Sequence, residues 1–333
     1  MRRALAIAVA VALVLAQAQP ALAYLKFGVT IGGRQVTLKW AQSPVRYFVS
    51  TQGVTDVGVP DLQAALDRAF TSWQTVPTAT ISYQFGGMTA AVPGRDDGSS
   101  TLGFQNRPEL DRVLASTSFL VDRVTGALVE SDIFFNSAFP WSVSAAGTTG
   151  RYDLESIALH EIGHLSGLGH SALGETELRD TGGRRVLAAE AVMFPIAFAP
   201  GSIVARTLKA DDIAGLSDLY PETDFQQAFG SVSGRVTKDG QAVFGAHVIA
   251  FDVARGSMVG SFTLNTQGQF SIAGLSPGPH ILRVEPIDDA ETDSFFDASR
   301  NVDIDFRAAF VNKVVIVPRG GDSGEMAVTV VRK

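Results

Sequence analysis

The 333-residue sequence contains no cysteine. Disulfide bonds are therefore excluded, and an exported chain of this composition has to rely on the packing of its core. A thiol nucleophile is excluded for the same reason. Export without disulfides suits a bacterial protein better than a small animal secreted module.

Positive charge and long apolar runs are also scarce. Lys and Arg number 27 against 34 Asp and Glu, which gives a formal net charge of −7 at pH 7. A mildly acidic chain without a basic stripe argues against a nucleic-acid partner. The apolar run at residues 4–16 has thirteen residues, fewer than the about 20 that a membrane-spanning helix needs. We therefore expect no membrane span.

The apolar run lies in a segment that has the order of a secretory signal peptide. Arg2 and Arg3 precede the run, and the small residues Ala21-Leu22-Ala23 follow it. A basic start, an apolar middle and a small-residue cleavage site are typical of such a peptide. We expect cleavage near Ala23, removal of residues 1–23, and a secreted, extracellular protein of bacterial type.

Histidine is rare as well, but three of the five histidines fall in one stretch, HEIGHLSGLGH, at residues 160–170. His160 and His164 are four residues apart, so on a helix both imidazoles can reach one metal ion. Glu161 lies beside that ion and can take a proton from its bound water. Gly167 favours the end of the helix, after which His170 can approach as a third ligand. Three ligands leave one position open, which is the arrangement of a catalytic zinc site.

Three other interpretations of this stretch need to be weighed. A bare HExxH pattern can be an amphipathic core helix with hydrogen-bonded histidines, but Gly167 and His170 at these offsets favour the zinc site. A catalytically silent, secreted binding or adhesion protein on the same scaffold is an alternative, although such a protein has no need for Glu161. A structural zinc site would want four ligands, and no fourth is evident.

The HExxHxxGxxH pattern with a later methionine resembles the metzincin metallopeptidases. Ser171 after the third histidine, the segment 191–195 and the segment 208–220 are similar to the matrixin branch, the matrix-metalloproteinase relatives. The resemblance covers about residues 24–221. It implies an α+β catalytic domain with a twisted mixed sheet and long helices.

The resemblance also implies a function for the site. We expect a zinc metalloendopeptidase with one catalytic zinc ion held by His160, His164 and His170, with Glu161 as general base and with proteins or peptides as substrates. Met193 would pack beneath the metal as the methionine turn rather than bind it. Residues 195–198 would line a substrate pocket, with Ala197 where matrixins usually place a tyrosine.

The sequence departs from the animal matrixins in other respects. No histidine precedes His160, so we expect the second, structural zinc site of those enzymes to be missing. Asp96, Asp97 and Asp132 could hold calcium, although an Asp-Asp-Gly run is more often a solvated turn. Because the chain has no cysteine, we also expect no pro-segment that blocks the zinc through a thiolate. The insert 174–190 is either a mobile flap or a longer surface loop.

Local patterns predict the elements around the motif. We expect strands at 36–40, 45–49, 81–85, 114–121 and 127–135, a loop at 91–105, and Asp153 as the N-cap of the motif helix. The strand at 114–121 would form the sheet edge that pairs with an extended substrate. A further helix after Pro60-Asp61 carries apolar residues at 3 and 4 spacing, namely Leu62, Ala65, Leu66, Ala69, Phe70 and Trp73.

The pattern changes near residue 228. Short apolar or alternating runs separated by turns predict an all-β sandwich domain over 228–333, after a catalytic domain over 24–227. These runs fall at 231–237, 246–252, 258–264, 269–272 and 280–285. The stretches 234–237 and 265–278 resemble a carboxypeptidase-regulatory-like, transthyretin-like module. This second domain contributes no zinc ligand, so we expect it to be separable. Nothing indicates its own ligand, and His247 and His280 read as ordinary sheet residues.

Overall fold

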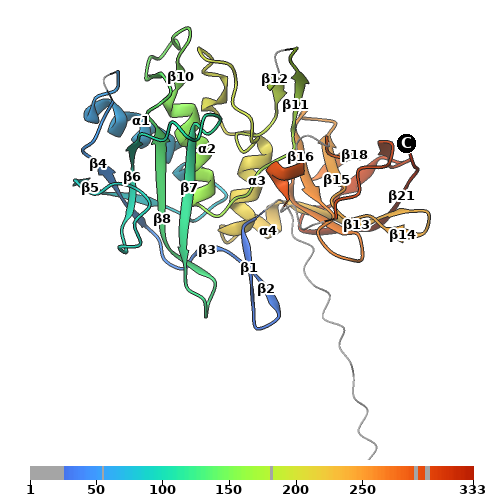
Figure 1. Ribbon diagram of the computed structural model, residues 1–333. Coiled ribbons are helices and arrows are strands. Elements are labelled where there is room, and N and C mark those ends of the chain that lie inside the picture. Colours follow the sequence, from blue (N-terminus) through green and yellow to red (C-terminus); the bar gives the residue numbers. More distant parts are fainter. Residues whose placement is uncertain (1–25, 55, 181–182, 289–291, 297–300) are drawn as a thin grey trace, which may run out of the picture.

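The computed structural model describes residues 26–333 except 55, 181–182, 289–291 and 297–300 (Figure 1). The expected signal peptide lies outside this part of the chain. Among the helices that the structure describes, none is long and apolar enough to cross a membrane.

A six-stranded mixed sheet organises the first half of the chain. Five of its strands pair in parallel, in the order β3 (Lys39–Trp40), β8 (Ala127–Asn136), β6 (Ser100–Gln105), β4 (Val45–Ser50) and β5 (Tyr83–Thr89). The remaining strand, β7 (Ala115–Val121), pairs antiparallel with β8 alone and forms the edge of the sheet. The expected edge strand at 114–121 is therefore confirmed.

The position of β6 was not expected, because residues 91–105 read as a loop. Residues 100–104 are buried, and the strand lies between β4 and β8. A strand that is covered on both sides need not show polar and apolar alternation, so its own sequence carries little signal. The prediction of a loop over the whole of 91–105 is wrong for its second half.

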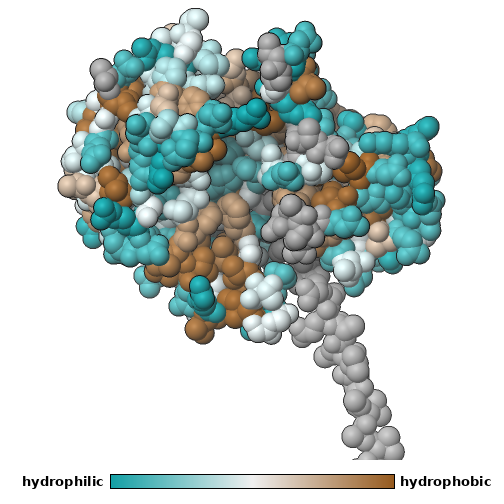
Figure 2. All heavy atoms as spheres, viewed as in Figure 1, coloured by the Kyte–Doolittle hydropathy of each residue, from teal (hydrophilic) through white to brown (hydrophobic). Residues whose placement is uncertain are grey.

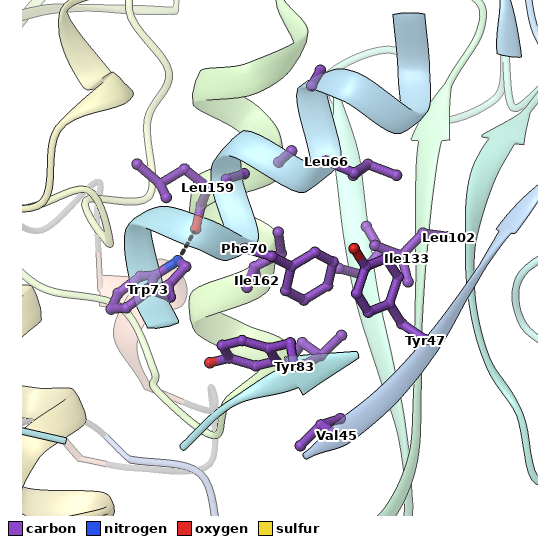
Figure 3. Packing of buried hydrophobic residues seen from close by; sticks show 14 of the residues in the cluster. Val45, Tyr47, Leu66, Phe70, Trp73, Tyr83, Leu102, Ile133, Leu159 and Ile162 are labelled. Carbon is purple, nitrogen blue, oxygen red and sulfur yellow. Dashed lines mark hydrogen bonds between the residues drawn. The ribbon is translucent and has the colours of Figure 1, made fainter. Parts of the chain in front are cut away.

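Two helices pack on one face of this sheet, α1 (Val59–Gln74) and α2 (Leu154–Leu165). All six residues of the expected apolar stripe on α1 are buried, which confirms that prediction. Trp73 is fully buried, and its Nε1 donates a hydrogen bond of 2.8 Å to the carbonyl oxygen of Leu159 on α2 (Figure 3). The stacked rings of Tyr47 and Phe70, 3.9 Å apart, join α1 to the sheet.

Several shorter elements surround this core. They are the hairpin β1 (Gly28–Ile31) and β2 (Arg34–Thr37), the parallel pair β9 (Trp141–Ser142) and β10 (Tyr152–Asp153), the 3-10 turn η1 (Val204–Arg206), and the helices α3 (Ala210–Leu219) and α4 (Phe225–Ala228). The insert after the third histidine also has regular structure. It forms an antiparallel hairpin of β11 (Gly174–Leu178) and β12 (Arg184–Ala189) with no buried residue in either strand, and these strands were not expected.

The last third of the chain contains two further sheets. The four-stranded sheet consists of β13 (Gly230–Lys238), β14 (Gln241–Ala242), β17 (Gln269–Leu275) and β21 (Gly321–Val330). The five-stranded sheet consists of β15 (His247–Asp252), β16 (Met258–Phe262), β18 (Gly278–Glu285), β19 (Ala309–Phe310) and β20 (Val315–Val317). One buried cluster takes residues from both, for example Val232 and Leu282. This arrangement is consistent with an all-β unit; its likeness to a particular module stays a prediction.

Helix α3 lies between the two halves of the molecule (Figure 1). Its residue Leu216 belongs to the cluster beneath the six-stranded sheet, whereas Ala214 belongs to the cluster of the two later sheets. The approach to β17 is close, because a Cβ atom on Gly274 would lie 2.9 Å from the Cβ of Ala214. The two halves of the molecule therefore pack directly against each other. The expected domain boundary between residues 227 and 228 stays a prediction.

Candidate metal centre and its surroundings

The helix that carries the motif begins and ends as the sequence predicts. The Asp153 side chain accepts hydrogen bonds from the backbone N–H and the hydroxyl of Ser156, which confirms it as the N-cap of α2. Arg206 donates two hydrogen bonds to the same carboxylate. After α2, Gly167 has a φ of 101°, and a Cβ there would lie 2.6 Å from the carbonyl oxygen of Leu38. Only glycine fits this turn, which brings the chain back toward the helix.

The turn places the three histidines of the motif together. One ring nitrogen from each of His160, His164 and His170 lies within 4.8 Å of those of the other two. The Nε2 atoms of His164 and His170 are 3.1 Å apart. Of the described residues, these three form the single group of histidine and acidic side chains with a spacing suited to one metal ion.

The other nitrogen of each ring is held by a backbone carbonyl oxygen. Nδ1 of His160 lies 2.8 Å from the oxygen of Val192, and Nδ1 of His164 lies 2.8 Å from that of Leu168. Nδ1 of His170 lies 2.6 Å from the oxygen of Ser294, a residue 124 positions further on. Because a carbonyl oxygen only accepts, each Nδ1 carries the proton and each Nε2 keeps a free lone pair. This is the tautomer that metal-binding histidines use.

Burial keeps the three rings neutral. Desolvation, reinforced by His170, lowers the pKa of His160 to about 3. The pKa of His164 is lowered well below its ordinary value by burial and by the other two rings, and burial also lowers the pKa of His170. Neutral imidazole is the form that binds metal, so the site is ready for a cation at pH 7.

Glu161 is buried next to the three rings, with an exposed fraction of 6%. Its carboxylate accepts a hydrogen bond of 2.6 Å from the hydroxyl of Thr117 on β7. Burial raises the pKa of Glu161 to about 7, and the Thr117 hydrogen bond opposes that rise. Thr117 was not recognised from the sequence, because only the packing of β7 against α2 brings it to the glutamate.

Met193 packs against the motif helix α2. It is 2% exposed, and a Cβ atom on Gly163 would lie 2.2 Å from its sulfur. Asp212, buried at the start of α3, accepts hydrogen bonds from the backbone N–H groups of Val192 and Met193 at 2.9 and 3.1 Å. Asp212 therefore fixes the backbone at Val192 and Met193, a role that the sequence did not reveal.

Two of the three acidic residues considered for calcium have other contacts. Asp132 accepts hydrogen bonds from the backbone N–H groups of Gly94, Arg95 and Thr101, and Asp97 accepts one of 3.0 Å from that of Ser99. These contacts hold the loop before β6. They give calcium no support, because the oxygens of Asp132 already act as acceptors for backbone groups.

A mixed sheet, a motif helix on its face and three convergent histidines form a site that could hold one metal ion. The family model described as Matrixin matches residues 39–181, a segment that includes all three histidines and Glu161. The chain thus carries a matrixin-like domain.

Similarity to individual proteins covers part of their length. Metalloendoproteinase 1 of Glycine max is 42% identical over 82 residues, or 23% of this chain and 20% of the relative. Matrix metalloproteinase-16 of Rattus norvegicus is 31% identical over 40% of this chain and 22% of its own length. Metalloendoproteinase 1-MMP of Arabidopsis thaliana is 28% identical over 55% of this chain and 44% of its own length. The chain spans less than half of the length of each of these relatives. The matches support a metalloprotease, at low identity and over part of the chain.

Proposed function

We propose that this protein is a zinc-dependent endopeptidase whose zinc ion is held by His160, His164 and His170. The observation that carries the proposal is the shared orientation of the three rings: every Nδ1 donates to a backbone carbonyl, which leaves three neutral nitrogens grouped together. A bound zinc ion would supply Lewis-acid chemistry, which lowers the pKa of water and polarises a carbonyl group. Three protein ligands suit a catalytic rather than a structural ion.

In this proposal Glu161 is the general base. Its carboxylate would accept a proton from the attacking water and pass that proton to the leaving amine of the cleaved bond. Thr117 orients the carboxylate through its hydrogen bond of 2.6 Å, which suits a positioned base. Met193 would support the site from beneath by packing.

The substrate would be an extended protein or peptide. β7 is paired along one side by β8, and its other side is free of strands among the described residues. An extended peptide can add to such an edge through backbone hydrogen bonds. Because Thr117 on β7 contacts Glu161, a peptide on this edge would lie beside the base. Figure 2 shows hydrophobic surface over the lower part of the β7–β8 hairpin, which would receive apolar side chains.

The decisive test combines metal analysis with one substitution. The purified protein should contain one zinc per chain, cleave casein, and lose this activity with a chelator. Glu161→Gln should keep the zinc and the melting temperature but lose at least about 100-fold in kcat, the lower end of what a positioned base contributes. Glu109→Gln, at a side chain that is 60% exposed, is the matched control. A wild-type protein that binds zinc without cleaving any protein would instead support a catalytically silent binding function.

We also propose that the protein is secreted after removal of residues 1–23. The support is the order of basic, apolar and small residues in the sequence. N-terminal sequencing of exported protein should find Tyr24 first. A retained Met1 in the exported protein would contradict this.

A further inference from the structure

One of the three histidines is held by the far end of the chain. His160 and His164 donate to carbonyl oxygens at most 32 positions away in the sequence, those of Val192 and Leu168. His170 instead donates to Ser294 at 2.6 Å. Ser294 belongs to the short helix α5 (Thr292–Phe295), which lies between β18 and β19 in the sequence and is the orange-red helix near the centre of Figure 1. The ring of Phe295 also stands edge-on to His170, with 6.4 Å between the ring centres.

The helix α5 is anchored by aromatic packing to the later sheets. Phe296, directly after it, is 9% exposed and contacts the rings of Phe262 and Phe244 at 5.4 and 5.6 Å. Phe295 contacts Phe262 at 5.8 Å. Since Phe262 ends β16 and stacks on His247 of β15, the position of Ser294 depends on the five-stranded sheet.

The same sheet also contacts segments that follow the third histidine in the sequence. The backbone N–H of Gly260 on β16 donates to the buried carboxylate of Asp211 on α3 at 2.8 Å. Leu173, three residues after His170, forms a buried cluster with Ala191 and with Ile249 of β15. These contacts are independent of α5, and they fix the loop of His170 relative to the sheet from which Ser294 is presented.

We infer that the C-terminal β unit, residues 230–330, helps to form the metal centre, because it supplies Ser294 as a positioning residue for His170. The carbonyl oxygen of Ser294 fixes the proton on Nδ1 and the orientation of the ring, so the affinity of the site for zinc depends on the docked β unit. Loss of a partner of this kind typically costs 10- to 100-fold in metal affinity. The inference rests on the proposed zinc function, and it replaces the expectation that the β unit is separable from the chemistry.

The test uses full-length variants, because the carbonyl group itself cannot be removed by substitution. Phe296→Ala deletes the main anchor of α5, and Phe310→Ala is the control, at a residue of β19 in the same unit that is 64% exposed. The Kd for zinc is measured by competition with a chromogenic chelator at pH 7. We expect a rise of about 10- to 100-fold for Phe296→Ala and no change for Phe310→Ala.

Nitrogen-15 NMR of the histidine side chains provides a readout that does not need the metal. In the wild type all three Nδ1–H groups should be protected from solvent. In Phe296→Ala the signal of His170 alone should broaden or exchange, while those of His160 and His164 remain. If Phe296→Ala does not fold, Phe244→Ala, which removes a ring that contacts Phe296 without touching His170, is measured in the same way.

The outcomes separate the two proposals. Wild-type protein that takes up no zinc overturns the proposed function. Wild-type protein that binds zinc, together with a folded variant of equal Kd and an unaltered His170 signal, overturns only the role of Ser294. A rise of similar size in Phe310→Ala would also overturn it, because the effect would then be a general loss of stability.

Discussion

Gly163 lies inside the motif helix, and we expect the addition of even one methyl group there to lower the stability of the protein. A Cβ atom there would lie 2.2 Å from the sulfur of Met193, 3.2 Å from its methyl carbon and 2.9 Å from a ring carbon of Trp73. Neither neighbour can move freely. The indole of Trp73 is fully buried and hydrogen-bonded to Leu159, and the backbone of Met193 is held on one side by Asp212 and on the other by Ser171.

Two opposing effects set the size of the change in Gly163→Ala. Replacing glycine by alanine within a helix stabilises it by roughly 1 kcal/mol. Overpacking a tight core costs typically 1–3 kcal/mol, and contacts this short with two buried side chains place the cost near the upper end. We therefore expect a net destabilisation of about 1–2 kcal/mol. That corresponds to a fall in Tm of roughly 2–8 °C, at about 2–4 °C per kcal/mol.

The assay is thermal unfolding of the full chain with a chelator present, followed by zinc titration. Zinc binding should weaken too, because Val192, which holds His160, is the neighbour of Met193. In a Met193→Ala background the penalty of Gly163→Ala should shrink by at least about 1 kcal/mol, since the main clash is gone. A Gly163→Ala protein as stable as the wild type, or an unchanged penalty in the double variant, would refute the argument.

Three further predictions concern the site and its pH dependence. Thr117→Val removes the hydrogen bond to Glu161. Because a hydrogen bond to a charged group contributes about 1.5–3 kcal/mol, kcat on a peptide should fall about 10- to 100-fold with KM little changed. Thr117→Ser keeps the hydroxyl and should restore most of kcat. His164→Ala deletes a proposed ligand, so both bound zinc and the rise in Tm on adding zinc should be lost, as metal analysis and melting curves can show. Burial raises the pKa of Asp211 from its ordinary 3.8 to about 7. Between about pH 4 and pH 7 the folded state therefore retains a proton that the unfolded chain has lost. The stability that this bound proton contributes is lost as the pH rises from 4 to 7. Asp211→Asn can still accept from Gly260 and should flatten the fall in Tm between pH 4 and 7; a slope equal to that of the wild type would contradict the assignment.

The features that the sequence predicted correctly depend on residues close together in the chain. The stripe on α1 follows from the 3.6-residue period of a helix. Asp153 caps a helix three residues away, and the spacing of His160 and His164 places both on one turn. The turn at Gly167 follows from a local steric limit that the residue itself reveals.

The features that the sequence did not reveal depend on contacts between distant segments. β6 is a strand because β4 and β8 flank it. Thr117 reaches Glu161 across 44 residues, and Ser294 reaches His170 across 124. Hydroxyl groups and backbone carbonyl groups occur in so many residues that the residue type does not indicate which of them has a role at the site. Such a role depends on the packing that brings the group to its partner. The sequence by itself therefore determined which residues are proposed as ligands and as base, whereas only the tertiary structure decided what orients them.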